Sequence, residues 1–70
     1  MTLTPHNVEQ TVADELASTG MSAISQNIIA DAFGFDHTEQ VTEWARDFAE
    51  QHDLTSYYEF DRELVIFRRA

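Results

Sequence analysis

Three histidines, at positions 6, 37 and 52, are the side chains of this sequence best suited to proton transfer or metal binding near neutral pH. His37 follows Asp36 directly and precedes Glu39 by two residues, a spacing that allows a loose surface site for a divalent cation. None of the three histidines, His6, His37 or His52, lies in a His-Glu-x-x-His pattern, which places two metal ligands on one helix face. A histidine in a capping turn is the commoner arrangement, so we expect no metal site.

The other groups capable of chemistry also lack sequence partners. There is no cysteine, which excludes thiolate catalysis, disulfides and cysteine-ligated metal sites. No serine or threonine lies in a nucleophile elbow, and two glycines are too few for a phosphate-binding loop. The carboxylates fall on helix faces that we predict to be exposed, whereas a general acid needs an apolar setting. We therefore expect no catalytic residue, no cofactor and no enzymatic activity.

The charge balance is strongly acidic. The 70 residues include 13 aspartates and glutamates, four arginines and no lysine, which gives a formal net charge of -9. Proteins that bind nucleic acids or anionic membranes need a basic surface, so direct nucleic-acid binding is not expected at ordinary salt. Proteomes adapted to molar salt also replace lysine with acids, and a halophilic origin of this composition remains an open alternative. Molar salt would screen repulsion from DNA.

The length is that of one small domain, which we expect to span residues 1–70. No apolar run approaches the 18 residues that a membrane-spanning helix requires. The segment Met1 to His6 has neither the basic nor the apolar region of a signal peptide. These features together predict a cytoplasmic protein that does not contact membranes.

Three segments have the apolar periodicity and the end signals of helices. Thr4, Ser25 and Asp36 are the expected N-caps, and Gly20 and Gly34 are the expected C-terminal stops. The predicted helices span about residues 5–18, 25–33 and 37–53.

The rest of the chain is predicted to form a linker and a β-hairpin. Met21 to Ile24 is interpreted as a short linker or a single extended segment. After Leu54 the apolar period changes to two, which predicts a hairpin over about residues 55–68 with Asp61-Arg62 as a two-residue turn. The register of this turn places Tyr58, Phe60, Val65 and Phe67 on one face and Tyr57, Glu59, Leu64, Ile66 and Arg68 on the other.

The expected fold class is therefore α+β, with three helices followed by a C-terminal β-hairpin, as in a small winged-helix domain. The run Ile29 to Phe35, Ile-Ala-Asp-Ala-Phe-Gly-Phe, resembles the apolar-Ala-x-x-apolar-Gly-apolar pattern of helix-turn-helix proteins. This resemblance implies a third helix that enters the DNA major groove. The alternative function is accordingly a small winged-helix transcriptional regulator, dimeric and from a halophile. Its nucleic-acid contacts would be Arg46, Arg62, Arg68 and Arg69.

The third predicted helix departs from that pattern because its outward side is acidic. On a helical wheel, five carboxylates fall within an arc of about 80°, opposite the apolar stripe of Val41, Trp44 and Phe48. These five are Asp36, Glu39, Glu43, Asp47 and Glu50. A solvated face that keeps the protein soluble is one interpretation. The other is a protein-interaction module that contacts a basic protein surface and imitates DNA, as small acidic inhibitors from phages and plasmids do, including anti-CRISPR proteins.

Both faces of the predicted hairpin are apolar, and three helices of this size cover only one face of a two-stranded sheet well. Tyr57, Leu64 and Ile66 are therefore expected to form a second contact surface, for a second copy of the chain or for another partner. The alternative is that the first helix wraps around the sheet and buries them.

Overall fold

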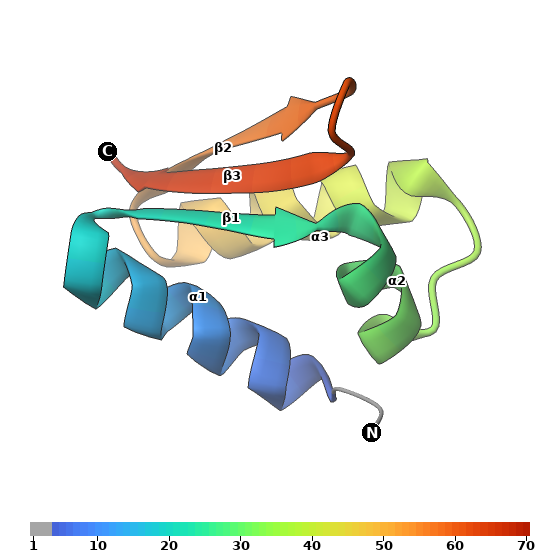
Figure 1. Ribbon diagram of the computed structural model, residues 1–70, viewed down its shortest axis with the longest axis horizontal. Helices are drawn as coiled ribbons and strands as arrows, with labels where there is room; N and C mark the ends of the chain where they lie inside the picture. The colour runs from blue at the N-terminus through green and yellow to red at the C-terminus, as the bar shows by residue number, and fades with distance from the viewer. Residues whose placement is uncertain (1–3) are drawn as a thin grey trace.

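The computed structural model describes residues 4–70 and contains three helices and three strands in mixed order (Figure 1). The elements are α1 (Pro5–Thr19), β1 (Met21–Ser25), α2 (Gln26–Phe33), α3 (Thr38–Gln51), β2 (Leu54–Glu59) and β3 (Leu64–Arg69). The expected order of three helices followed by a hairpin is therefore wrong, because β1 lies between α1 and α2. The expectation about a leader at Met1 to His6 lies partly outside the described residues.

The strands form one antiparallel sheet in the order β1-β3-β2, so β3 is the central strand. Val65 has Ile24 opposite it on one side and Tyr58 on the other. The β2–β3 register agrees with the prediction, because Glu59 faces Leu64. The connection is nevertheless longer than two residues, since Phe60 and the three residues after it lie outside both strands. Phe60, which was expected on the covered face, is 80% exposed.

The ends of α1 and α2 lie where capping chemistry predicts them, within one residue of the expected bounds. The Thr4 side-chain oxygen accepts a hydrogen bond from the Asn7 backbone N–H, and the Ser25 hydroxyl accepts one from Asn27. Gly20 then ends α1 with a φ of 79°, a left-handed conformation that glycine adopts without steric cost.

The start of α3 differs from the expectation. His37, and not Asp36, is the N-cap residue, and the helix ends at Gln51 instead of near residue 53. The Gln40 side-chain oxygen accepts hydrogen bonds from the backbone N–H groups of Asp36 and His37, at 2.7 and 3.0 Å. This contact from within the first turn satisfies both donors, so the Asp36 carboxylate is not needed as a cap.

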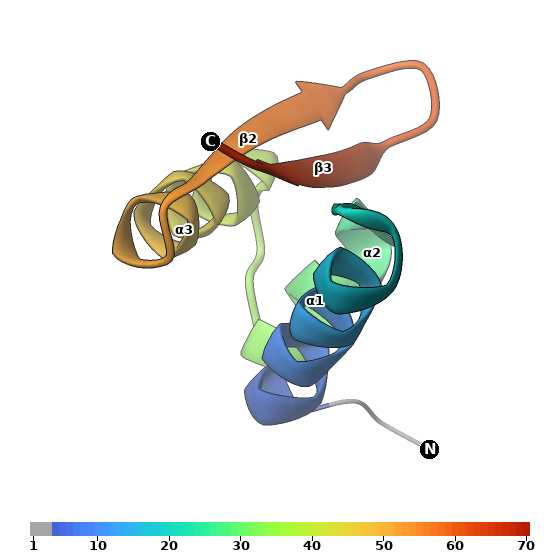
Figure 2. The ribbon, with the colours of Figure 1, turned by 90° about the vertical axis from the view of Figure 1, so that its left-hand side faces the viewer.

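All three helices pack against the same face of the sheet, and the opposite face carries none of them (Figure 2). The core is one cluster of eleven buried apolar residues, drawn from every element except β2. These residues are Val8, Val12, Leu16, Ile24, Ile29, Val41, Ala45, Phe48, Ala49, Val65 and Phe67. Among residues 4–70, no helix has the length and apolar character needed to cross a membrane.

Ser22 is the one polar residue that the described part of the core encloses completely, with 1% of its surface exposed. Its hydroxyl donates a 2.5 Å hydrogen bond to a carboxylate oxygen of Glu15 on α1, and this contact ties β1 to the helix. Ser22 flanks Phe67 on the β1 side, and Ser56 flanks Phe67 on the β2 side but is exposed.

We expect Ser22→Ala to lower the free energy of unfolding by about 1 kcal/mol, because Glu15 then loses its partner at a partly buried position. Ser56→Ala is the matched control, with the same substitution beside the same phenylalanine, and its expected effect is below about 0.5 kcal/mol. Urea denaturation followed by circular dichroism measures both. Equal losses for the two variants would contradict the role given to the Ser22 hydrogen bond.

Candidate functional site

The exposed side of α3 carries a row of four carboxylates, which we call the acidic face and define as Glu39, Glu43, Asp47 and Glu50. All four are exposed, and the opposite side of α3 is buried through Val41, Ala45, Phe48 and Ala49. The helical rise places Glu39 and Glu43 about 6 Å apart along the axis and the whole row over about 16 Å. Asp36 is also exposed but precedes the helix, so it extends the row only loosely.

No ion pair involves this row within the part of the chain that the structure describes. The single ion pair there joins Arg62 Nε to Glu59 Oε1 at 3.4 Å, in the β2–β3 connection. Arg46 is exposed on α3, where it borders a hollow of about 230 Å³ beside Ser56 and Tyr57 on β2. The acidic face is therefore solvent-facing and forms no ion pair within residues 4–70, and the nearest cation along α3 is Arg46, about one helical turn from both Glu43 and Glu50.

The aromatic residues of α3 hold the acidic face in place. The Trp44 ring lies 4.8 Å from Phe33 and 5.2 Å from Phe48, and it is T-shaped to the Phe67 ring at 5.9 Å (centroid distances). The Trp44 indole faces the core, as predicted. It is only half-buried, however, and not fully enclosed. The indole thus closes the edge of the α2–α3 contact and orients the helix.

The uncovered side of the sheet is a second candidate surface, which we call the outer sheet face. It contains the side chains that alternate with the core residues along the strands, namely Met21, Ala23, Ser25, Thr55, Tyr57, Glu59, Leu64, Ile66 and Arg68. Tyr57 is 64% exposed and Met21 40%, while Leu64 and Ile66 are half-buried. The alternative in which α1 wraps around the sheet is wrong, because α1 lies against the other face (Figure 2).

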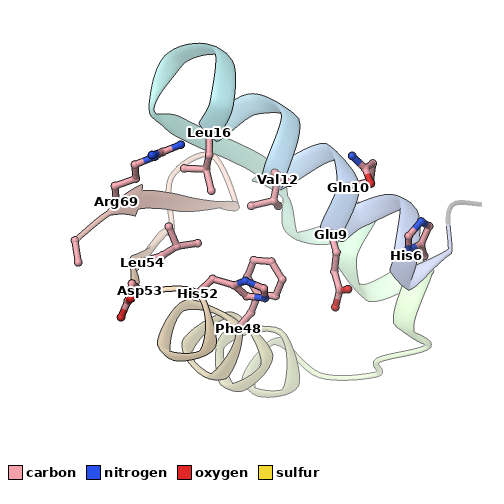
Figure 3. Close-up of a pocket in the computed structure, with 12 residues that line it drawn as sticks. His6, Glu9, Gln10, Val12, Leu16, Phe48, His52, Asp53, Leu54 and Arg69 are labelled. Carbon is pink, nitrogen blue, oxygen red and sulfur yellow. The ribbon is translucent and has the colours of Figure 1, made fainter.

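A cleft of about 660 Å³ separates α1 from the C-terminal end of α3 (Figure 3). Val12 and Leu16 line it from α1, and Phe48 lines it from α3. The His52 ring packs on Phe48 with 4.4 Å between centroids, and Arg69 lies at the rim. Nothing in the sequence predicts this cleft, because its walls are brought together only when α1 and α3 each pack against the sheet.

Two histidines and one glutamate are among the described residues that line the cleft. His6, Glu9 and His52 all line it, yet no side-chain hydrogen bond links any of them to a nucleophile or to one another. Within residues 4–70, no three histidine or carboxylate side chains lie close enough together to hold a metal ion. Asp36, His37 and Glu39 do not form such a group.

The four arginines named as alternative nucleic-acid contacts lie in four different settings. Arg46 lies on α3 and Arg62 pairs with Glu59 in the hairpin connection. Arg68 is on the outer sheet face, and Arg69 lines the cleft. The fold does not gather them into one basic patch.

No protein-family model matches this chain, and neither a curated protein nor a solved structure resembles it at a significant level.

Proposed function

We propose that this protein is a non-enzymatic interaction module that binds a basic surface of another protein through the acidic face of α3, as an inhibitor or adaptor that imitates DNA. The observation that carries this proposal is the row formed by Glu39, Glu43, Asp47 and Glu50. These carboxylates are all exposed and have no cation partner within residues 4–70.

The geometry suits a ligand for a groove that normally binds nucleic acid. Carboxylates one helical turn apart are separated by about 6 Å along the axis, the same order as the phosphate spacing of a nucleic-acid strand. The buried residues of α3 fix the backbone of the row before any partner arrives, so little backbone order has to be gained on binding. A net charge of -9 also steers a basic partner towards the protein and speeds association.

A second candidate function is DNA binding by a helix-turn-helix regulator. The specific support is local: α2 ends at Gly34 with a φ of 73°, and α3 begins four residues later, as in a helix, a tight turn and a second helix. In that arrangement the acidic face would meet the phosphates, which disfavours binding at ordinary salt. Molar salt, where the Debye length is about 3 Å, would relieve much of this repulsion.

Charge reversal on α3 tests the first proposal. We expect the double variant Glu43→Lys/Asp47→Lys to keep its fold, because both side chains are exposed, and to bind its partner at least about tenfold more weakly. The matched control is Glu9→Lys/Asp14→Lys, which changes the net charge equally but alters α1. The measurement is capture of proteins from the source cell by immobilised wild-type and variant chains, followed by titration of each captured protein.

The captured protein must also lose bound duplex DNA when the wild-type chain is added, and the Glu43→Lys/Asp47→Lys variant must fail to displace it. Equal weakening by both double variants would show that net charge alone matters and would contradict a specific role for α3. Binding of random duplex DNA by the wild-type chain itself, at low salt, would favour the regulator instead.

A further inference from the structure

We propose that the outer sheet face is the docking site for a second copy of this chain, in a symmetric dimer that stacks the two sheets face to face. The proposal is independent of the acidic face, because α3 lies on the other side of the sheet (Figures 1 and 2). It rests on the exposure, the charge pattern and the shape of the outer sheet face.

Two large apolar side chains of the outer sheet face are exposed to solvent. Tyr57 is 64% exposed at the middle of β2, directly opposite Ile66 on β3, and Met21 is 40% exposed on β1. An exposed tyrosine beside aliphatic side chains is the kind of residue that dominates binding energy at protein interfaces. No other element of residues 4–70 covers this patch.

The charges on the outer sheet face are arranged to match a copy of themselves. Arg68 lies at one end, opposite Thr55, and Glu59 lies at the other end, opposite Leu64. Four residues of strand separate the two ends, which corresponds to about 13 Å. With a twofold axis in the interface plane and perpendicular to the strands, the Glu59 end of each copy lies over the Arg68 end of its partner. An axis parallel to the strands would instead bring like charges together.

A shallow hollow lies between those charges. It has a volume of about 510 Å³, and its lining includes Thr55, Tyr57, Glu59, Ile66 and Arg68. In the proposed dimer the twofold axis passes close to the Tyr57–Ile66 pair, so this pair meets the same pair of the other copy at the centre of the contact. Arg62, which pairs with Glu59 within one chain, stays at the edge of the contact.

The dimer is expected to be weak and to depend on salt. Three strands about 5 Å apart and six residues long cover roughly 15 by 20 Å, which is less than the area of a standard stable interface. Each copy also carries a net charge of -9. Added salt therefore strengthens the dimer by screening this repulsion, whereas it weakens a contact between the acidic face and a basic partner.

Analytical ultracentrifugation from micromolar to millimolar protein, in 0.15 M and 1 M NaCl, tests the dimer. We expect the wild type to dimerise more tightly at the higher salt and Tyr57→Glu to dimerise at least about tenfold more weakly. Phe60→Glu is the matched control, because this residue is 80% exposed, lies in the hairpin connection and gives the same change of charge. Circular dichroism melting curves confirm that each variant is folded.

Mixing two charge variants tests the symmetry. Glu59→Arg alone and Arg68→Glu alone each place like charges together in a homodimer, so each is expected to associate roughly tenfold more weakly than the wild type. In an equimolar mixture, a heterodimer restores opposite charges at both contacts, and association should return to near the wild-type level. A wild type that stays monomeric in both salts, a Tyr57→Glu variant that dimerises normally, or a mixture no tighter than its components would each overturn the proposal.

Discussion

Replacing Phe67 with alanine is expected to lower the free energy of unfolding by about 3–5 kcal/mol. Phe67 has no exposed surface, lies on the central strand β3, and packs in T-shaped geometry against the Trp44 and Phe48 rings, with centroid distances of 5.9 and 5.5 Å. The substitution removes a buried ring and leaves a cavity that β1 and β2 hold open. A domain of this length gains only about 3–5 kcal/mol from its core, so most molecules should unfold at room temperature.

The matched control for this experiment is Phe60→Ala, which removes the same ring from a side chain that is 80% exposed. Its only aromatic contact described is with Tyr58, at 4.8 Å, so its expected effect is below about 1 kcal/mol. Thermal denaturation followed by circular dichroism separates the two variants. A Phe67→Ala chain that melts within a few degrees of the wild type would contradict the described core.

Salt is expected to stabilise the fold by an amount on the order of 3 kcal/mol between 0.01 and 1 M NaCl. Folding confines 13 carboxylates and four arginines to a body with a radius of gyration of 11.0 Å. Two unit charges 10 Å apart in water repel by about 0.4 kcal/mol, and an unfolded chain holds its charges farther apart. The added salt shortens the Debye length from about 30 to about 3 Å, which removes most of this repulsion.

Two double variants serve as controls for the salt experiment, because one makes the net charge less negative and the other makes it more negative. Glu43→Gln/Asp47→Asn reduces the repulsion and should flatten the dependence of the melting temperature on salt. Arg68→Gln/Arg69→Gln removes two of the four arginines and should steepen it. A melting temperature that is the same at both salt concentrations in the wild type would show that the carboxylates are not crowded.

The parts of the fold that the sequence predicts are those set by local chemistry. Thr4 and Ser25 cap their helices with side-chain oxygens, and Gly20 and Gly34 end them, because these residues act on neighbours within one turn. The pairing of Glu59 with Leu64 was also predictable, since a short connection fixes the register of a hairpin.

The strand β1 was not predictable by the same reasoning, because its burial is inverted relative to its hydropathy. Ser22 is buried and Met21 is exposed, since Ser22 has a hydrogen-bond partner in Glu15 and lies beside Phe67. The partner strand of β1 begins about 40 residues later, at Leu64, so no local sequence pattern predicts the pairing of the two strands. A five-residue segment after a glycine therefore resembles a linker until the complete sheet is known.

Among the candidate surfaces, those that depend on local spacing were predictable from the sequence, and the cleft was not. Helical spacing was enough to place Glu39, Glu43, Asp47 and Glu50 on one exposed side, and alternation along the strands was enough to place Tyr57 opposite the covered face. The cleft between α1 and α3 depends on how two helices that are far apart in the sequence are placed in space. The periodicity within each helix does not predict that placement.

The central position of β3 has a consequence for biosynthesis. β1 and β2 do not pair with each other, and both complete their hydrogen bonding only through residues 64–69. During synthesis, β1 and β2 are therefore made before the strand with which both pair. The sheet forms only after β3 has been synthesised. A released chain that ends before Leu64 would leave β1 and β2 without their partner strand and open to chaperones and proteases.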